Sequence, residues 1–140
     1  EFFGGDFDGI TSKLPYVKSL GVNAIYFTPT FPSRSNHRYD ATSFDEIDPL
    51  LGGDLAFLRY LKAARALKIR TLSDLTTNHC GVGHRWIQRA LKDSHSTERE
   101  FFYWDKNVKH GYAGWWGLAS LPKLNYNSKK LWHRISWSSW

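Results

Sequence analysis

The sequence predicts an α/β fold in which two helices alternate with two short strands. Apolar residues recur at spacings of three and four in the segments 9–20 and 54–68, which is typical of amphipathic helices. A short apolar run follows each of them, at 24–27 and at 69–75. The order helix, strand, helix, strand is typical of a right-handed crossover unit with parallel strands.

The first helix is expected over residues 9–20, with Gly21 as its stop signal. Its apolar stripe consists of Ile10, Leu14, Val17 and Leu20. Pro15 would disrupt a helix interior, so we place it in the first turn, where its missing N–H costs little. The following near-continuous apolar run at 24–27 closes before Pro29 and predicts a buried parallel strand.

The second helix is expected from Asp54, a suitable N-cap, to Lys68, whose charge suits the C-terminal dipole. Its apolar stripe consists of Leu55, Leu58, Leu61, Ala64 and Leu67. The second strand is expected over residues 69–75, where apolar and small polar residues alternate.

The pattern changes after residue 80. A short helix is expected over residues 86–91, followed by aromatic and glycine-rich sequence at 101–104 and 111–117. The ending at 135–140 is a poor continuation of a helix. The regular helix and strand rhythm is therefore interrupted by an insertion.

Composition excludes several function classes. The 140 residues are 41% hydrophobic, which is enough for a core, and the single Cys80 excludes an intramolecular disulfide and a Cys-rich zinc site. The net charge is +6, but no run of five like charges occurs, so we predict a solvated basic surface and no nucleic-acid partner. No stretch reaches the roughly 18 apolar residues of a membrane span, and no secretory signal is visible. We therefore expect no membrane partner and favour a cytoplasmic location, although the first residues read as sequence from inside a protein.

Four motifs follow one another in a fixed order. They are GGDFDG at 4–9, the apolar run at 21–31 with NHRYD at 36–40, DLTTNH at 74–79, and LPKLN at 121–125. Together they resemble the α-amylase family of glycoside hydrolases, glycoside hydrolase family 13. The resemblance implies a catalytic (β/α)8 TIM barrel with an excursion, domain B, after the third strand.

The resemblance also implies a domain organisation. Residues 1–80 would hold a partial TIM barrel, namely its first helix, second strand, second helix and third strand. Residues 81–130 would form the domain B-like excursion, and residues 131–140 an uncertain C-terminal tail. The LPKLN motif resembles the Met-Pro-Lys-Leu-Asn segment of the neopullulanase, cyclomaltodextrinase and maltogenic-amylase branch. That branch implies α-glucans or maltooligosaccharides as substrate, and a parent enzyme that could be a homodimer.

Site residues follow from the same resemblance. Tyr39 matches the family tyrosine that stacks under the sugar next to the cleaved bond, and Asp40 matches a carboxylate that supports this subsite. His79 matches the histidine that binds the 6-hydroxyl there, and Asp74 could orient neighbouring loops by hydrogen bonding. The strand ends of a barrel face the active site, which favours these roles. The alternatives are a loop with an aromatic anchor at Tyr39 and a structural role for His79.

Two further assignments rest on the resemblance. Trp115 and Trp116 could stack on glucose rings, or they could belong to the core of a small domain. Asn78 corresponds to a calcium ligand of many α-amylases, and amide oxygens suit calcium. The branch with LPKLN-like motifs often binds calcium through the loop that matches Gly4 and Asp6. A structural calcium ion is therefore a possible cofactor.

The bond-breaking residues of the family are not expected in this chain. Retaining hydrolysis needs a carboxylate nucleophile and an acid about 5 Å apart. The family places both on strands after the third, beyond these 140 residues. We expect the chain to be a fragment of a retaining glycoside hydrolase that binds substrate but is inactive alone. The alternative is a non-catalytic carbohydrate-binding fragment or a pseudoenzyme.

Overall fold

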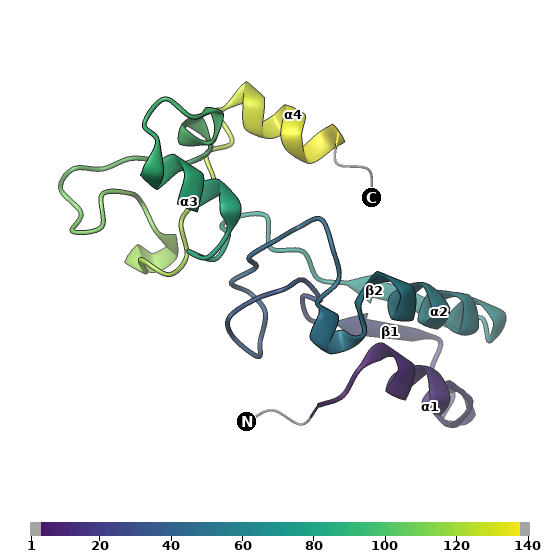
Figure 1. Cartoon of the computed structure of the whole chain (residues 1–140). Coiled ribbons are helices and arrows are strands. Elements are labelled where there is room, and N and C mark those ends of the chain that lie inside the picture. Colours follow the sequence, from purple (N-terminus) through teal and green to yellow (C-terminus); the bar gives the residue numbers. More distant parts are fainter. Residues whose placement is uncertain (1–3, 138–140) are drawn as a thin grey trace.

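The computed structural model describes residues 4–137 (Figure 1). Its helices and strands are α1 (Phe7–Ser19), β1 (Ala24–Phe27), α2 (Gly53–Ala66), β2 (Arg70–Ser73), α3 (Arg85–Lys92) and α4 (Lys129–Trp137). Short 3-10 turns are η1 (Pro49–Leu51), η2 (Thr97–Phe101) and η3 (Trp115–Gly117). Figure 1 shows α1, α2 and the two strands together in one part of the molecule, and α3 and α4 together in another. No helix within residues 4–137 is long and apolar enough to cross a membrane.

The two strands form a parallel pair, as the crossover order predicts. Their register pairs Ala24 with Arg70 at one end and Phe27 with Ser73 at the other. Helices α1 and α2 cover one face of the pair with a shared apolar cluster. The hydroxyl of Tyr60 on α2 also lies 3.1 Å from the hydroxyl of Thr71 on β2.

The prediction that 24–27 is a buried strand was wrong for one of its two faces. The side chains of Tyr26 on β1 and Leu72 on β2 are opposite each other in the register, and they are 61% and 52% exposed. The described residues supply helices for only one side of the sheet. The strand is therefore apolar enough for burial on both faces but is covered on one.

The position of Pro15 was also predicted wrongly. Helix α1 begins at Phe7 because the carboxylate of Asp6 caps it, accepting a hydrogen bond of 2.6 Å from the amide of Gly9. Pro15 consequently lies inside the helix. There it removes the hydrogen bond that an amide would donate to the carbonyl of Thr11.

The predicted cap of the second helix was wrong too. The N-cap of α2 is Gly52, with φ 95°, and a Cβ at this position would lie 2.6 Å from the Cβ of Ala56. Only glycine suits this combination of left-handed backbone and close approach. The carboxylate of Asp54 instead accepts a hydrogen bond of 2.8 Å from the amide of Ile47, which fastens the preceding loop to the helix.

The buried stripe of α2 differs from the predicted one. Ala56, Tyr60 and Ala64 are buried, whereas Leu55 and Leu58 are 72% and 59% exposed. The buried residues are four apart, so they too form one row along the helix. Small alanines on either side of one large ring let α2 lie close to α1 and the sheet. The exposed leucines form a second apolar row that no described residue covers.

The segment after residue 80 has its own apolar core. It is formed by Cys80, Trp86, Ile87, Ala90, Phe101, Phe102, Tyr112, Leu124 and Leu131. Most of the aromatic sequence at 101–104 and at Tyr112 therefore builds this core. We predicted that residues 135–140 would continue a helix poorly, and this was wrong for residues 135–137, because α4 extends to Trp137. The buried Leu131 holds this helix on the core. Residues 138–140 lie outside the described residues.

His84 connects this core to the start of α3. Its Nδ1 accepts a hydrogen bond of 3.1 Å from the amide of Trp86, and its ring lies 5.0 Å from that of Phe44. Burial, and then the charge of Arg85, lower the pKa of His84 to about 4. The folded protein therefore holds a neutral histidine in its core, and protonation would remove the helix cap.

This burial predicts acid sensitivity. An unfolded histidine takes up a proton near pH 6.5, whereas the folded His84 takes it up near pH 4. The free energy of unfolding should therefore fall as the pH drops through this window, by about 3 kcal/mol from this group. Urea unfolding between about pH 7 and about pH 4.5 measures the loss, and His84→Asn, which keeps a capping side chain, should flatten it. The same slope in both proteins would contradict the assignment.

Candidate functional site

Two loops leave the same edge of the sheet. Because β1 and β2 are parallel, Phe27 and Ser73 both end at their carboxyl edge. The amide of Asp74 donates a hydrogen bond of 2.9 Å to the carbonyl of Phe27, so the pairing continues past the strands. The segments 28–48 and 74–79 therefore start next to each other, and they carry Tyr39, Asp40, Asp74, Asn78 and His79.

Asp74 joins these two loops. The hydroxyl of Tyr39 donates a hydrogen bond of 2.7 Å to one carboxylate oxygen, and the amide of Leu75 donates one of 2.9 Å to the other. Hydrogen bonds from Tyr39 and then from Tyr26 lower the pKa of Asp74, and Asp74 in turn raises the pKa of Tyr26 to about 12. Asp74 is thus an ionised acceptor held by two neutral phenols.

His79 fastens the same loops from below the surface. It is 5% exposed, and its Nε2 lies 3.0 Å from the carbonyl oxygen of Tyr39. Its Nδ1 lies 3.2 Å from the side-chain nitrogen of Asn78. Burial lowers the pKa of His79, so the ring is neutral at neutral pH. These contacts assign the proton to Nε2, which donates to Tyr39, while Nδ1 accepts from Asn78.

Three aromatic rings form a stack beside this junction. The ring of Trp115 lies 5.3 Å from that of His79 at an interplanar angle of 26°. The ring of Trp116 lies 4.3 Å from that of Trp115 at 11°. Exposure rises along the stack, from 5% at His79 to 37% at Trp115 and 84% at Trp116. The stack therefore leads from the buried histidine to a flat apolar surface.

The turn that carries the two tryptophans is tightly held. A Cβ on Gly114 would lie 2.1 Å from the carbonyl oxygen of Leu118, so only glycine fits there. Trp116 has φ 50°, a left-handed conformation that costs free energy for a residue with a side chain. Isolated bridges pair Gly114 with Pro122 and His79 with Lys123. Backbone pairing thus connects this turn to the loop after β2.

Asp40 faces its own loop. Its carboxylate accepts a hydrogen bond from the hydroxyl of Ser35 and another of 3.3 Å from the amide of Arg34. Its backbone lies against Gly81, where a Cβ would be 2.2 Å from the carbonyl oxygen of Asp40. Asp40 therefore shapes the loop that presents Tyr39, and its charge also favours a proton on His79.

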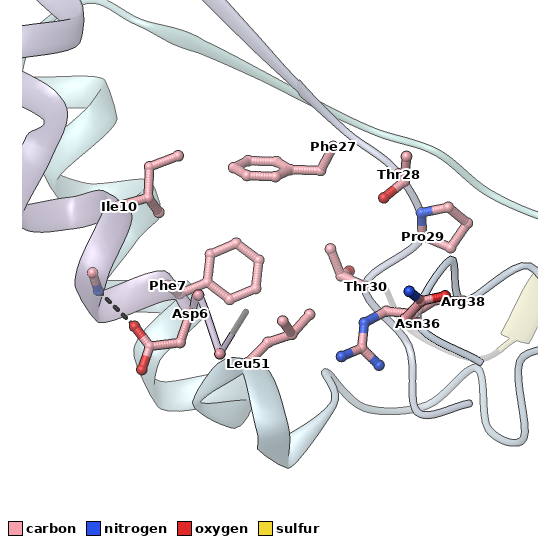
Figure 2. A pocket seen from close by; sticks show the side chains of 13 residues that line it. Asp6, Phe7, Ile10, Phe27, Thr28, Pro29, Thr30, Asn36, Arg38 and Leu51 are labelled. Atoms are coloured by element: carbon pink, nitrogen blue, oxygen red, sulfur yellow. Dashed lines mark hydrogen bonds between the residues drawn. The ribbon is translucent and has the colours of Figure 1, made fainter. Parts of the chain in front are cut away.

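A separate cavity of about 600 Å³ lies between the start of α1 and the loop after β1. Figure 2 shows Asp6, Phe7 and Ile10 on one side of it, with Arg38 on the other. The guanidinium of Arg38 forms a buried ion pair with Asp48. The lining of the cavity thus combines apolar side chains with Asp6 and with Arg38, whose charge Asp48 balances.

The calcium prediction concerns Gly4 and Asp6 at this cavity and Asn78 beside His79. One oxygen of Asp6 already caps α1. Within residues 4–137 no cluster of three or more His, Cys, Asp or Glu side chains could hold a metal ion. Calcium takes about six to eight oxygen ligands, so these residues alone do not fit a complete site. Calcium binding stays a prediction, and no chemistry below depends on it.

Sequence reasoning missed two partners in this site. Tyr26 was assigned only to a strand, although its place opposite Leu72 puts its side chain on the uncovered face, next to Asp74. The contact between His79 and Trp115 was also missed. The first could be found from strand alternation. The second has no signal in the sequence.

Fold and site together define an α/β protein with a cluster of polar and aromatic side chains at the carboxyl edge of parallel strands. Residues 3–134 match the family described as alpha amylase, catalytic domain. The chain therefore belongs to the alpha-amylase family of glycoside hydrolases, and the resemblance drawn from its motifs is confirmed. The two parallel strands and their helices match part of that catalytic domain.

Individual relatives agree. The chain is 35% identical over 153 residues to an amylopullulanase of Thermoanaerobacter thermohydrosulfuricus, covering 99% of this chain and 10% of that protein. It is 35% identical over 128 residues to a cyclomaltodextrinase of Thermoanaerobacter pseudethanolicus, covering 91% and 21%. The solved structure of the cyclic alpha-maltosyl-(1→6)-maltose hydrolase from Arthrobacter globiformis, in complex with maltose, superposes with a TM-score of 0.89 at 34% identity, covering 96% and 32%. The chain thus spans only a tenth to a third of the length of these proteins.

Proposed function

We propose that the chain forms part of the substrate-binding face of a retaining glycoside hydrolase that acts on α-glucans. One observation carries the proposal, namely that three segments far apart in sequence meet at one junction. Tyr39 contacts Asp74 through its hydroxyl and His79 through its carbonyl, and His79 stacks on Trp115. The relatives, which include an amylopullulanase and a cyclomaltodextrinase, support α-glucans as the substrate class.

Tyr39 is the proposed platform for the sugar next to the cleaved bond. Its side chain is 37% exposed although its hydroxyl is held by Asp74. A ring that is fixed at its tip and partly exposed offers a flat apolar surface to the C–H groups of a glucose ring. Asp40 supports this platform by shaping its loop. Asp74 supports it by holding the hydroxyl.

His79 is proposed to contact substrate and to position Tyr39 at the same time. Both of its ring nitrogens have protein partners, so a sugar hydroxyl can be contacted only by sharing or replacing one of them. The neutral ring has one N–H donor, and Tyr39 accepts it. The proposed sugar contact therefore implies a local rearrangement when substrate binds.

Trp115 and Trp116 are the proposed second platform. Trp116 is 84% exposed and lies flat on Trp115, so it presents one free face to solvent. The alternative role in a domain core does not suit this exposure. Holding an exposed indole in a left-handed conformation costs about 1–3 kcal/mol, and such strain often marks a functional position.

We further propose that the nucleophile and the acid lie outside these 140 residues. A general acid in a glycosidase needs a raised pKa, whereas the two phenols lower the pKa of Asp74. The carboxylate of Asp40 is engaged by its own loop. Neither group therefore suits bond cleavage. If the longer protein also lacks these carboxylates, the alternative of a non-catalytic carbohydrate-binding protein applies.

The test is glucan binding without hydrolysis. We expect maltoheptaose to bind the chain in a calorimetric titration with no release of reducing sugar. Trp116→Ala should weaken this binding about tenfold, since an aromatic contact of this kind is worth about 1.4 kcal/mol. The matched control is Tyr16→Ala, which removes a 64% exposed ring from α1, away from the junction. Equal losses in both variants, or hydrolysis that requires Asp74, would contradict the proposal.

A further inference from the structure

A groove of about 650 Å³ lies between α3 and α4, away from the junction described above. The turn η2 contributes Thr97, Glu98 and Phe101 to its lining. Trp86 and Phe101 are buried and give it an apolar floor. Its basic lining residues are Arg85, Arg89, Lys129, Lys130, His133 and Arg134. Basic side chains therefore stand on both helices that border the groove.

The carboxylates near the groove neutralise only part of this charge. Asp45 pairs with Arg85 and also with Arg134. Glu98 and Glu100 each pair with one further cation, at 3.0 Å and 2.6 Å, namely Arg89 and Lys130. Five Lys and Arg side chains thus face three carboxylates, which leaves an excess of two positive charges.

The lysines of α4 do not stabilise their own helix. Lys129 and Lys130 occupy its first turn, which holds no acidic residue. Cations at this end are unfavourable, because the helix dipole is positive there. Arg85 has the same position on α3, whose first turn also lacks an acid. Within residues 4–137, the ammonium group of Lys129 has no hydrogen-bond or ion-pair partner. Two helices that both contact η2 thus place cations in their first turns around one hollow, and of these Lys129 has no carboxylate partner in the described part of the chain.

We propose that this groove binds a phosphate group, either free or carried on a sugar. A dianionic phosphate monoester would neutralise the excess of two charges. The planar fork of Arg89 can donate two hydrogen bonds to phosphate oxygens, and lysines can contribute point charges. The volume lies in the range of about 300–1,000 Å³ that is usual for small-molecule sites. This volume is larger than free phosphate requires. The floor formed by Trp86 offers an apolar surface for a sugar ring.

The test is a calorimetric titration of the chain with inorganic phosphate and with glucose 6-phosphate at constant ionic strength. The double variant Lys129→Gln and Lys130→Gln should weaken binding of both probes at least about tenfold. The matched control is Lys106→Gln with Lys109→Gln, which removes the same charge from an exposed loop outside the groove. The control should bind within about twofold of the unmodified chain. A lower Kd for glucose 6-phosphate would assign the sugar phosphate, and equal Kd values would assign free phosphate.

The variant Arg89→Gln lies on α3, so its effect does not depend on a structural change in α4. It should also weaken the binding of both probes. Circular dichroism on each variant reports whether the helices remain. Equal weakening in the groove variant and in the control variant would overturn the proposal, because the effect would then come from the net charge of the protein and not from the groove. Absence of saturable binding by the folded, unmodified chain would overturn it as well.

Discussion

Tyr39→Ala is expected to lower kcat/KM for α-glucan hydrolysis about 100-fold in the longer enzyme that we propose, equivalent to about 2.7 kcal/mol. The change removes the ring platform, and it removes the 2.7 Å hydrogen bond that joins the Tyr39 loop to Asp74. The free energy of unfolding should change much less, because this side chain is 37% exposed. Steady-state kinetics and urea unfolding of the same variant measure the two quantities.

Tyr39→Phe separates the ring from the hydroxyl. The platform stays, and Asp74 keeps its hydrogen bonds from Leu75 and Tyr26, so we expect a loss of only about 3- to 10-fold. Combining Tyr39→Phe with Asp74→Asn tests the junction itself. If the hydroxyl acts through Asp74, the two losses should be less than additive. Small and equal effects of the phenylalanine and alanine variants would make Tyr39 an ordinary loop anchor.

The strands could be predicted from sequence because they are short apolar runs between clear boundaries. The run at 24–27 lies between Gly21 and Pro29, and its bounds match those of β1. Which face of each element is buried could not be predicted in the same way. Helix α2 carries two rows at helical spacing, one with Leu55 and one with Tyr60. Only the packing of α2 against α1 and the sheet decides that the second row is buried.

The positions of the site loops could be predicted from the topology of the sheet, whereas the contacts between the loops could not. Parallel strands bring the loops that follow them to one edge, so Tyr39 and Asp74 could be placed near each other. The engagement of both ring nitrogens of His79 depends on the conformation of Tyr39, which is 40 positions away, and of its neighbour Asn78. Spacing carries no information about such contacts. For this reason the sequence suggested a free donor at His79 that the folded chain does not have.

His79→Ala is expected to lower kcat/KM about 100-fold in the same longer enzyme. The change removes the donor that holds the carbonyl of Tyr39 at 3.0 Å and the ring on which Trp115 stacks. Both proposed platforms would lose a support, and a displacement of about 1 Å can cost about 100-fold in rate. The free energy of unfolding should also fall, by about 1–3 kcal/mol, because a buried hydrogen-bond partner is lost.

His79→Gln distinguishes positioning from mere stability. A glutamine amide can donate to the carbonyl of Tyr39, so this variant should recover most of the unfolding free energy. It cannot reproduce the ring stack on Trp115, which is 5.3 Å from His79, or the imidazole contact proposed for the sugar. We therefore expect His79→Gln to stay at least about tenfold below the unmodified enzyme in kcat/KM while unfolding almost normally. If activity and stability recover together, the role of His79 is limited to holding the Tyr39 loop.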